Sequence, residues 1–397
     1  MKREGFIGGL AAGSALAGFG TFPVEAQANP ITLGAAISLS GIFSDGGHYS
    51  LEGYQLGIAH VNARGGVLGR QLALKYYDDQ SAPATGVRLY ERLINEDKVD
   101  IVTGPYGTAI SAPAANVAAR YRMVMLMPET ADVVMFSRGN RYIFQGLGPV
   151  QTYLYGLLSI ARDHGLRRLA VIGGDTAFPH SLANATPEVM RGFGQAIVYQ
   201  EFYPGNASDF SSVVEKVRAA NPDVVLAMAF PTDSLGLVRQ LKQSNYAPKM
   251  FYSAVGASDP LFVKNVGRDC DGTFSAVAWN FSAKTPENER FVRDYREMFK
   301  RDPDYHSASN YSAIMLYAEA IKRAGGIDQE KIRDAFATMR VQTLLGKYRV
   351  NEQGIQLGYT SYIIQWQNGK QVIVYPGNAQ GSGKPIVPFP AWSDPNR

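Results

Sequence analysis

Two kinds of hydrophobic pattern alternate along the chain from residue 31 onward. Short apolar runs, such as 31–37, predict buried strands. Each run is followed by a stretch in which apolar residues recur every three or four positions; in 49–62 these include Leu51, Tyr54 and Ile58 on one helical face. Alternating strands and helices joined by short loops predict an α/β fold with parallel, doubly wound sheets.

The alternation runs through the chain twice. The first series predicts strands at 31–37, 72–77, 101–103 and 124–127, with helices at 49–62, 84–95 and 111–120. The second predicts helices at 153–163, 181–191, 210–219 and 234–243, with strands at 169–172, 196–202, 224–228 and 250–252. Later segments predict helices at 287–300 and 306–323, then extended pieces at 347–350, 359–367 and 371–375. Two units fit 397 residues better than one very wide sheet. A binding cleft is expected where their strand ends face each other.

The first 28 residues have the three parts of a secretory signal peptide. Lys2 and Arg3 give a positive start, 5–22 is uncharged, and Ala26-Gln27-Ala28 is a small-x-small cleavage site. A membrane anchor is the alternative, but the stretch is rich in glycine. The chain is therefore expected to be exported and cleaved near Ala28, by the general or the twin-arginine export route.

Composition narrows the class of protein. The chain has 39 basic and 35 acidic residues, and the basic ones are scattered, so no nucleic-acid partner is expected. At 46% hydrophobic and 11% aromatic residues, the chain is not disordered. Its single cysteine, Cys270, allows neither an internal disulfide nor a cysteine zinc cage, and no metal or cofactor is expected.

Enzyme signatures are weak or absent. There is no Gly-x-Ser-x-Gly elbow, and Gly381-Ser382-Gly383-Lys384 is followed by proline rather than by a helix. Asp78-Asp79 are adjacent at a strand end, where a turn role is favoured over paired catalysis. No catalytic residue is predicted, and the chain is interpreted as a non-enzyme.

Two loops after predicted strands favour ligand binding instead. Gly107 and Thr108 precede the third predicted helix, where backbone N–H groups and a hydroxyl can hold a carboxylate. An ordinary helix cap is the alternative. Glu129 and Thr130 follow the next strand at the same sheet edge, either in the cleft or in a solvated loop.

Several segments together carry a family resemblance. They are Leu39-Ser40-Gly41, Asn62-Ala63-Arg64-Gly65-Gly66-Val67-Leu68-Gly69-Arg70, Tyr77-Asp78-Asp79, Gly104-Pro105-Tyr106-Gly107-Thr108, Asp209-Phe210-Ser211 and Asn221-Pro222-Asp223. The chain resembles the periplasmic substrate-binding proteins of ABC importers, in the branched-chain amino-acid-binding group (type I, Leu/Ile/Val-binding-protein-like). The resemblance implies two Rossmann-like lobes joined by three hinge crossovers. Lobe one is expected at 29–147 plus 279–346, and lobe two at 148–278 plus 347–397.

The resemblance also implies a set of ligand contacts in the first lobe. Gly107 and Thr108 fall where the family holds a ligand carboxylate. Glu129 and Thr130 fall on the second ligand loop, where the family usually has small residues, so Glu129 departs from the pattern. Phe43 and Tyr106 would add aromatic surface.

In the second lobe, Phe178 and Phe230 fall near positions where relatives often have tyrosine. Val255 falls close to the acid that binds the ammonium in amino-acid binders. An amino-acid ligand would then need Asp233 or Glu129 as a substitute. Trp279 lies at a crossover, where it walls the cleft or packs the hinge.

The function implied is capture of a small organic solute and its delivery to the membrane permease of an ABC importer, by a monomer. The solute is expected to bear a carboxylate and to be amino-acid-like or aromatic. A sugar is disfavoured because Phe178 and Phe230 have no hydroxyl group. The alternatives are a sensor that feeds a membrane receptor and an exported enzyme.

Overall fold

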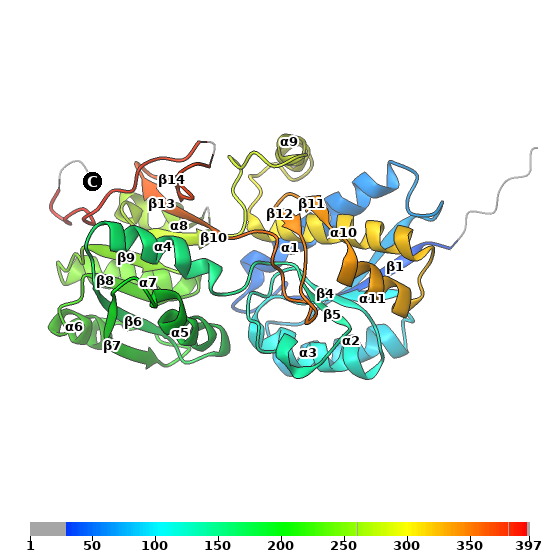
Figure 1. Cartoon of the computed structure of the whole chain (residues 1–397), viewed down its shortest axis with the longest axis horizontal. Helices are drawn as coiled ribbons and strands as arrows, with labels where there is room; N and C mark the ends of the chain where they lie inside the picture. Colours follow the sequence, from blue (N-terminus) through cyan, green and yellow to red (C-terminus); the bar gives the residue numbers. More distant parts are fainter. Residues whose placement is uncertain (1–28, 260, 380, 395–397) are drawn as a thin grey trace, which may run out of the picture.

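The protein forms two α/β lobes that lie side by side, each built on its own large sheet (Figure 1). The computed structural model describes residues 29–259, 261–379 and 381–394. The expected signal peptide, residues 1–28, lies outside the described residues. Among the described residues, no helix combines the length and the apolar character needed to cross a bilayer.

The first lobe has a five-stranded parallel sheet in the order β2-β1-β3-β4-β5. Its strands are β1 (Ile31–Ile37), β2 (Leu72–Asp78), β3 (Ile101–Thr103), β4 (Met125–Met127) and β5 (Ile143–Gln145). One face is covered by α1 (Ser44–Asn62), α10 (Tyr305–Ala324) and α11 (Gln329–Thr338), and the other by α2 (Pro83–Asn95) and α3 (Thr108–Arg120). The central strands β3 and β4 are wholly buried, as expected for parallel strands between two helix layers.

The second lobe has a seven-stranded sheet in the order β14-β13-β10-β9-β8-β6-β7. Its strands are β6 (Arg168–Gly174), β7 (Ala196–Tyr203), β8 (Val224–Met228), β9 (Met250–Ser253), β10 (Phe274–Val277), β13 (Tyr362–Gln367) and β14 (Lys370–Tyr375). Its helices are α4 (Thr152–Asp163), α5 (Ala177–Met190), α6 (Ser211–Ala219), α7 (Pro231–Gln243) and α8 (Leu261–Val266). Helices α4 and α5 pack on one face, and α6, α7 and α8 on the other.

The last two strands of this sheet form the hairpin that the Asn-Gly dipeptide predicts. Asn368 and Gly369 both have positive φ, of 54° and 69°, which is the backbone of a tight two-residue turn. β13 runs antiparallel to both β10 and β14, while the other pairings of this sheet are parallel. The hairpin thus extends an otherwise parallel sheet at one edge.

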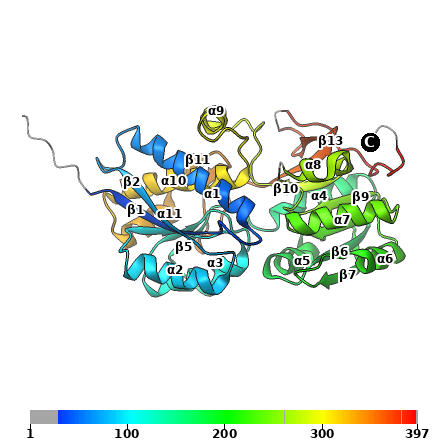
Figure 2. The same cartoon turned by 180° about the vertical axis from the view of Figure 1, so that it is seen from behind.

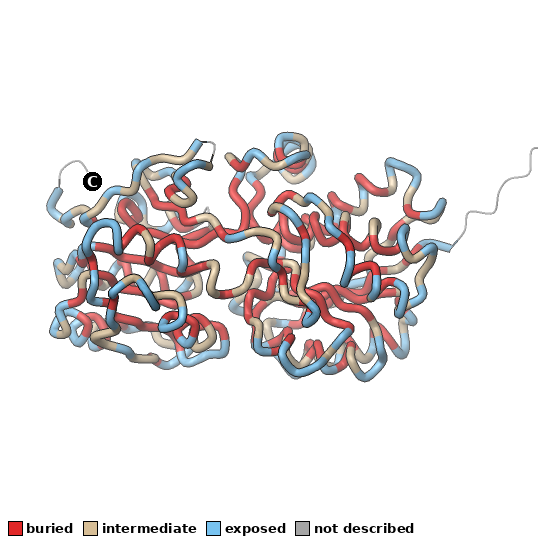
Figure 3. Tube along the Cα trace, in the orientation of Figure 1, coloured by how far each residue is buried: buried red, intermediate tan, exposed pale blue. Residues whose placement is uncertain are grey.

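The chain passes between the lobes three times: between β5 and α4, between β10 and α9 (Asn288–Phe299), and between β12 (Gly346–Tyr348) and β13. The predicted pair of doubly wound lobes joined by three crossovers is therefore confirmed. Helix α9 lies above the junction of the lobes in both views (Figure 2) and contacts α1. The first crossing segment is largely buried, whereas exposed and intermediate residues make up much of the other two (Figure 3). The short elements η1 (Phe136–Arg138), η2 (Gly267–Cys270) and β11 (Val341–Thr343) complete the fold.

Helix α1 begins five residues before the position that periodicity predicts. Gly46 and Gly47 lie in its first turn rather than ending the preceding loop. A Cβ atom on Gly47 would lie 1.8 Å from the carbonyl oxygen of Ser38, so this glycine permits a close approach of helix and strand end. At this position glycine allows the helix to pack closely against the end of the strand, and it does not interrupt the helix.

The glycine- and proline-rich C-terminal segment, 376–394, runs over the surface of the second lobe, with most of its described residues exposed or half-buried. Phe389 anchors it: its ring is buried against the second lobe, and its N–H donates to the carbonyl of Lys249.

Candidate ligand-binding site

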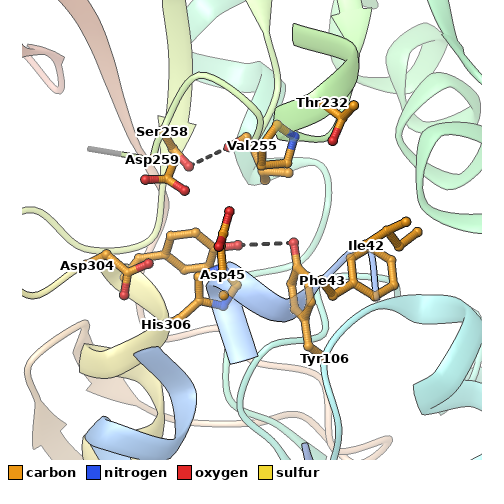
Figure 4. A pocket seen from close by; sticks show the side chains of 13 residues that line it. Ile42, Phe43, Asp45, Tyr106, Thr232, Val255, Ser258, Asp259, Asp304 and His306 are labelled. Atoms are coloured by element: carbon orange, nitrogen blue, oxygen red, sulfur yellow. Dashed lines mark hydrogen bonds between the residues drawn. The ribbon is translucent and has the colours of Figure 1, made fainter. Parts of the chain in front are cut away.

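Two adjoining pockets lie in the cleft between the lobes, at the carboxyl ends of the strands. The first is here named the aromatic pocket; it is lined by Tyr106, Gly107, Thr108, Glu129, Ala131, Leu147, Tyr153, Phe178, Phe230, Val255 and Tyr305. The second is here named the acidic pocket (Figure 4); it is lined by Ile42, Phe43, Asp45, Gly46, Tyr106, Pro231, Thr232, Val255, Ser258, Asp259, Asp304, Tyr305 and His306. The two share Tyr106, Val255 and Tyr305, so they are parts of one cleft.

Aromatic rings from both lobes meet around the aromatic pocket. Phe230, which precedes α7, lies 5.5 Å from Phe178 and 5.2 Å from Phe43 between ring centroids. Tyr106 meets Phe43 edge to face at 5.1 Å, and Tyr153 meets Phe178 in the same way at 6.3 Å. The sequence predicted Phe43, Tyr106, Phe178 and Phe230 here, and the structure brings all four together. These rings pack against one another and give the cleft an apolar, aromatic wall.

The N-terminus of α3 borders this pocket. Gly107 is the N-cap residue with φ of +80°, a backbone that favours glycine, and it supplies no side-chain cap. The N–H groups of Ile110 and Ser111 donate to Gly107 O, whereas those of Thr108 and Ala109 have no hydrogen-bond partner among the described residues. Thr108 is only 8% exposed, and no described group bonds its hydroxyl. These donors make the helix end suitable for a carboxylate.

Glu129 is already neutralised within the protein. Its carboxylate accepts hydrogen bonds from Ser50 Oγ at 2.9 and 3.0 Å and pairs with Nδ1 of His306, and all three side chains are buried. Burial lowers the pKa of His306, but the carboxylates of Asp304 and Glu129 outweigh it, so the net pKa lies above its ordinary value. Glu129 therefore has a counter-charge and is not a free partner for a ligand ammonium.

The other predicted substitute acid lies away from the pockets. Asp233 is in the first turn of α7, where its carboxylate accepts a hydrogen bond from the Tyr203 hydroxyl at 3.2 Å. Burial raises the pKa of Asp233 to about 6. It lines neither pocket, whereas Val255 lines both. The position at which the resemblance predicts an ammonium-binding acid thus presents an apolar side chain to both pockets.

Thr130 and Trp279 stand apart from the other predicted residues, since neither lines the two pockets. Thr130 donates its hydroxyl to Ser111 Oγ, and Ser111 in turn donates to Pro105 O, so this pair supports the loop before α3. The Trp279 indole donates to Asn288 Oδ1 at 2.6 Å and packs edge to face on Phe291. Trp279 therefore packs at the hinge, and it also lines a small cavity that shares Ser258, Asp304 and Tyr305 with the acidic pocket.

Sequence reasoning missed the beginning of α10, which brings Asp304, Tyr305 and His306 into the cleft. Asp304 caps this helix: its Oδ1 accepts from the N–H of Ser307, and the Ser307 hydroxyl accepts from the N–H of Asp304. The spacing of Asp304 and Ser307 ahead of a helical pattern was a readable signal. Tyr153, near the start of α4, was also missed because it belongs to an ordinary amphipathic helix.

The cap carboxylate should make the stability of the protein depend on pH. Burial raises the pKa of Asp304 to about 7, so the folded state binds its proton more tightly than the unfolded state does. The free energy of unfolding should then fall as pH rises from about 4 through 7. Asp304→Asn keeps an N-cap acceptor and should reduce this fall, as measured by urea unfolding between pH 5 and 8.

Asp328→Asn is the matched control, because Asp328 caps α11 from an exposed position. In this variant the free energy of unfolding should depend on pH as it does in the wild type. His306 titrates in the same direction, because its raised pKa gives stability that is lost at higher pH, so part of the slope should remain in Asp304→Asn. Parallel profiles for Asp304→Asn and the wild type would contradict the assignment.

Comparison with known proteins places this geometry in a family. A model described as periplasmic binding protein matches residues 30–371. The Leu/Ile/Val-binding protein homolog 8 of Brucella abortus is 28% identical over 376 residues, which cover 88% of this chain and 91% of that protein.

Two solved structures share the fold. One is the substrate-binding protein LivJ of a branched-chain amino acid transporter from Streptococcus pneumoniae in complex with isoleucine (TM-score 0.79, 19% identity, 90% of this chain and 100% of that chain). The other is an ABC transporter solute-binding protein from R. palustris in complex with benzoate (TM-score 0.78, 16% identity, covering 92% of this chain and 98% of that chain). The fold is thus that of the type I periplasmic binding proteins, a family of exported solute-binding proteins rather than enzymes. With most of its length matched, this chain belongs to the periplasmic binding protein family.

Proposed function

We propose that the protein captures a small carboxylate-bearing solute with an apolar or aromatic body and delivers it to the permease of an ABC importer. The observation that carries this proposal is the aromatic pocket, where unpaired donors at the start of α3 face rings from both lobes. The solute would contact both lobes only when they are closed. Binding would therefore shift the hinge equilibrium towards the closed form that the permease recognises.

The relatives support this class of solute. The curated homologue is named for leucine, isoleucine and valine, and the two structural neighbours hold isoleucine and benzoate. All of these compounds join a carboxylate to an apolar body. The ring-lined pocket and the apolar Val255 favour an aromatic body over a branched aliphatic chain.

The organisation expected for such a receptor follows the sequence. Because the third crossover follows β12, lobe one would comprise 29–147 plus 279–348, and lobe two 148–278 plus the chain from β13 onward. The protein would act as a periplasmic monomer after removal of the signal peptide near Ala28. N-terminal sequencing and light scattering of the exported protein test these two statements.

Thr108→Val should weaken binding of the solute about 5- to 150-fold, which corresponds to about 1–3 kcal/mol for an unpaired buried acceptor. A thermal-shift screen of residues 29–397 against aromatic carboxylates, aliphatic acids, amino acids and amides would first identify the solute. A ligand at one hundred times its Kd should stabilise the fold by about 2.7 kcal/mol. Calorimetry then gives the affinities of both variants.

Thr338→Val is the matched control, since this threonine is exposed at the end of α11 and bonds only its own helix. It should bind the solute as the wild type does. If Thr108→Val binds the solute as tightly as the wild type does, the assignment of the solute carboxylate to the start of α3 is wrong. If no carboxylate in the panel binds and mass spectrometry of denatured protein finds none co-purified, the proposed function fails.

A further inference from the structure

We propose that Gln145 is a positioning residue, whose buried side chain makes the loop 129–131 and the hinge of the protein move together. The loop is here named the second ligand loop, and it lines the aromatic pocket with Glu129 and Ala131. Gln145 itself lines neither pocket. The inference deepens the proposed function, on which it rests, because it concerns how the same cleft is shaped for its solute.

The side chain of Gln145 satisfies three buried backbone groups at once. Gln145 is the last residue of β5 and is wholly buried. Its Nε2 donates to the carbonyl oxygens of Thr130 at 3.1 Å and Ala131 at 2.9 Å. Its Oε1 accepts from the N–H of Gln356 at 3.2 Å. The opposite orientation of the amide would place an oxygen against two carbonyl oxygens, so these partners fix its direction.

The partners of Gln145 lie on two of the three crossovers between the lobes. The first crossover begins directly after Gln145, and the third contains Gln356 between β12 and β13. In Figure 1 this third segment runs as an orange loop beside β5, where the N–H of Gln145 donates to Gly354 O at 2.8 Å. The Tyr359 hydroxyl also donates to Gly146 O, at 2.7 Å. A hinge motion changes the backbone of the crossovers, so it must act on the segments bonded to Gln145.

Gln356 is held in place by the third crossover itself. Its side-chain Oε1 accepts from the N–H groups of Arg349 at 3.0 Å and Gly358 at 2.8 Å. Gln356 is buried and also forms an antiparallel bridge with Val350. The position of its own N–H, which meets Gln145, therefore depends on the conformation of the whole segment 349–358.

Further buried hydrogen bonds connect the second ligand loop to the loop before α3. The Thr130 hydroxyl donates to Ser111 Oγ at 2.8 Å, and the Ser111 hydroxyl donates to Pro105 O at 2.9 Å. Both side chains are buried, and close packing leaves them little room to shift independently. Residues 105–108 include the donors at which the solute carboxylate is proposed to bind. A continuous series of hydrogen bonds thus runs from the third crossover to both loops of the first-lobe site.

This series would make closure of the lobes and order in the site favour one another. In the structure, Gln145 holds the carbonyl groups of the second ligand loop while its Oε1 bonds the third crossover. A change of that crossover on opening would withdraw the N–H of Gln356 and free the Gln145 side chain. The loop would then lose its fixed donor, so the open form would have the less ordered site.

Hydrogen exchange of the ligand-free protein, measured by mass spectrometry, tests this coupling without any solute. Gln356→Ala removes the acceptor that organises the third crossover, but it leaves every group of the second ligand loop in place. It should raise amide exchange at least fivefold in the peptide 128–134. In the background of Gln145→Leu, the same change should add less than twofold there, because the connection is already broken.

Two matched controls distinguish coupling from general loosening. Gln353→Ala changes the same residue type in the same crossover, but the side chain of Gln353 is exposed. Gln195→Leu removes from the second lobe a buried amide that likewise donates to two carbonyl oxygens, those of Leu158 and Leu166. Both control variants should leave exchange in the peptide 128–134 as in the wild type.

The outcomes decide this inference separately from the proposed function. Wild-type exchange of 128–134 in Gln356→Ala overturns the inference, as does an equal rise in Gln353→Ala. This result does not depend on the folding of Gln145→Leu, because Gln356→Ala leaves Gln145 intact. If no carboxylate of the solute screen binds, the proposed function fails, while the exchange experiment still shows whether the hinge and the loop move together.

Discussion

Replacing His306 with alanine should lower the free energy of unfolding by about 3–5 kcal/mol at pH 7. Removing one partner of a buried ion pair leaves the other charge uncompensated, and costs of this size are typical. Glu129 would keep Ser50 as a hydrogen-bond donor but lose its counter-charge. Urea unfolding followed by tryptophan fluorescence measures the loss.

A double variant distinguishes the loss of the ion pair from the loss of side-chain packing as the cause of the destabilisation in His306→Ala. His306→Ala combined with Glu129→Gln removes both charges, so it should recover a large part of the stability lost in His306→Ala. His164→Ala is a suitable control, because this histidine caps the end of α4 from a partly exposed position. If the double variant is less stable than His306→Ala alone, the ion pair is not the source of the effect.

Gly53→Val should destabilise the first lobe by about 3 kcal/mol and weaken solute binding as well. A Cβ atom on Gly53 would lie 2.3 Å from the carbonyl oxygen of Ser307. That atom belongs to the backbone of α10 and has no rotamer by which to move away, so α1 and α10 must separate. Asp304 and His306 stand at the beginning of α10 and would move with it. Chemical unfolding and calorimetry measure the two effects.

Gly326→Val provides the control for Gly53→Val. Gly326 follows α10, has no positive φ and has no atom within 4 Å of the position of an added Cβ. It should leave stability within about 0.5 kcal/mol of the wild type. A Gly53→Val protein of normal stability with normal affinity would show that the helices tolerate wider separation.

The alternation of short apolar runs with helical periodicity was enough to predict two doubly wound lobes. Each central strand is covered on both faces, so its apolar run is visible without long-range information. The strands β5 and β10 were missed because each directly precedes a crossover and so falls outside the regular alternation of strand and helix. The observed start of α1 differs from the predicted one because Gly47 lies inside the helix, where it allows a close approach to the end of β1.

The cleft could be predicted in part. The loop after β3, with Thr108, was found because strand ends mark the edge of a parallel sheet, whereas Phe230 was assigned from the family resemblance. The partner of Glu129 was not found, because His306 lies 177 positions away and meets it only after folding. A carboxylate in a loop gives no sign of whether the fold supplies its counter-charge. Whether Glu129 is free to contact a ligand could therefore not be decided without knowing where α10 lies.

The pairing of α1 with α10 has a consequence for when the protein can fold. The two helices cover the same face of the first sheet, yet about 240 residues separate them along the chain. Until α10 has emerged, the apolar side chains of α1, such as Tyr54 and Leu56, lack the neighbour that buries them. An N-terminal fragment would thus remain incomplete throughout most of synthesis. Apolar surface of the first lobe therefore stays uncovered until late in synthesis, and during that time the chain is exposed to aggregation.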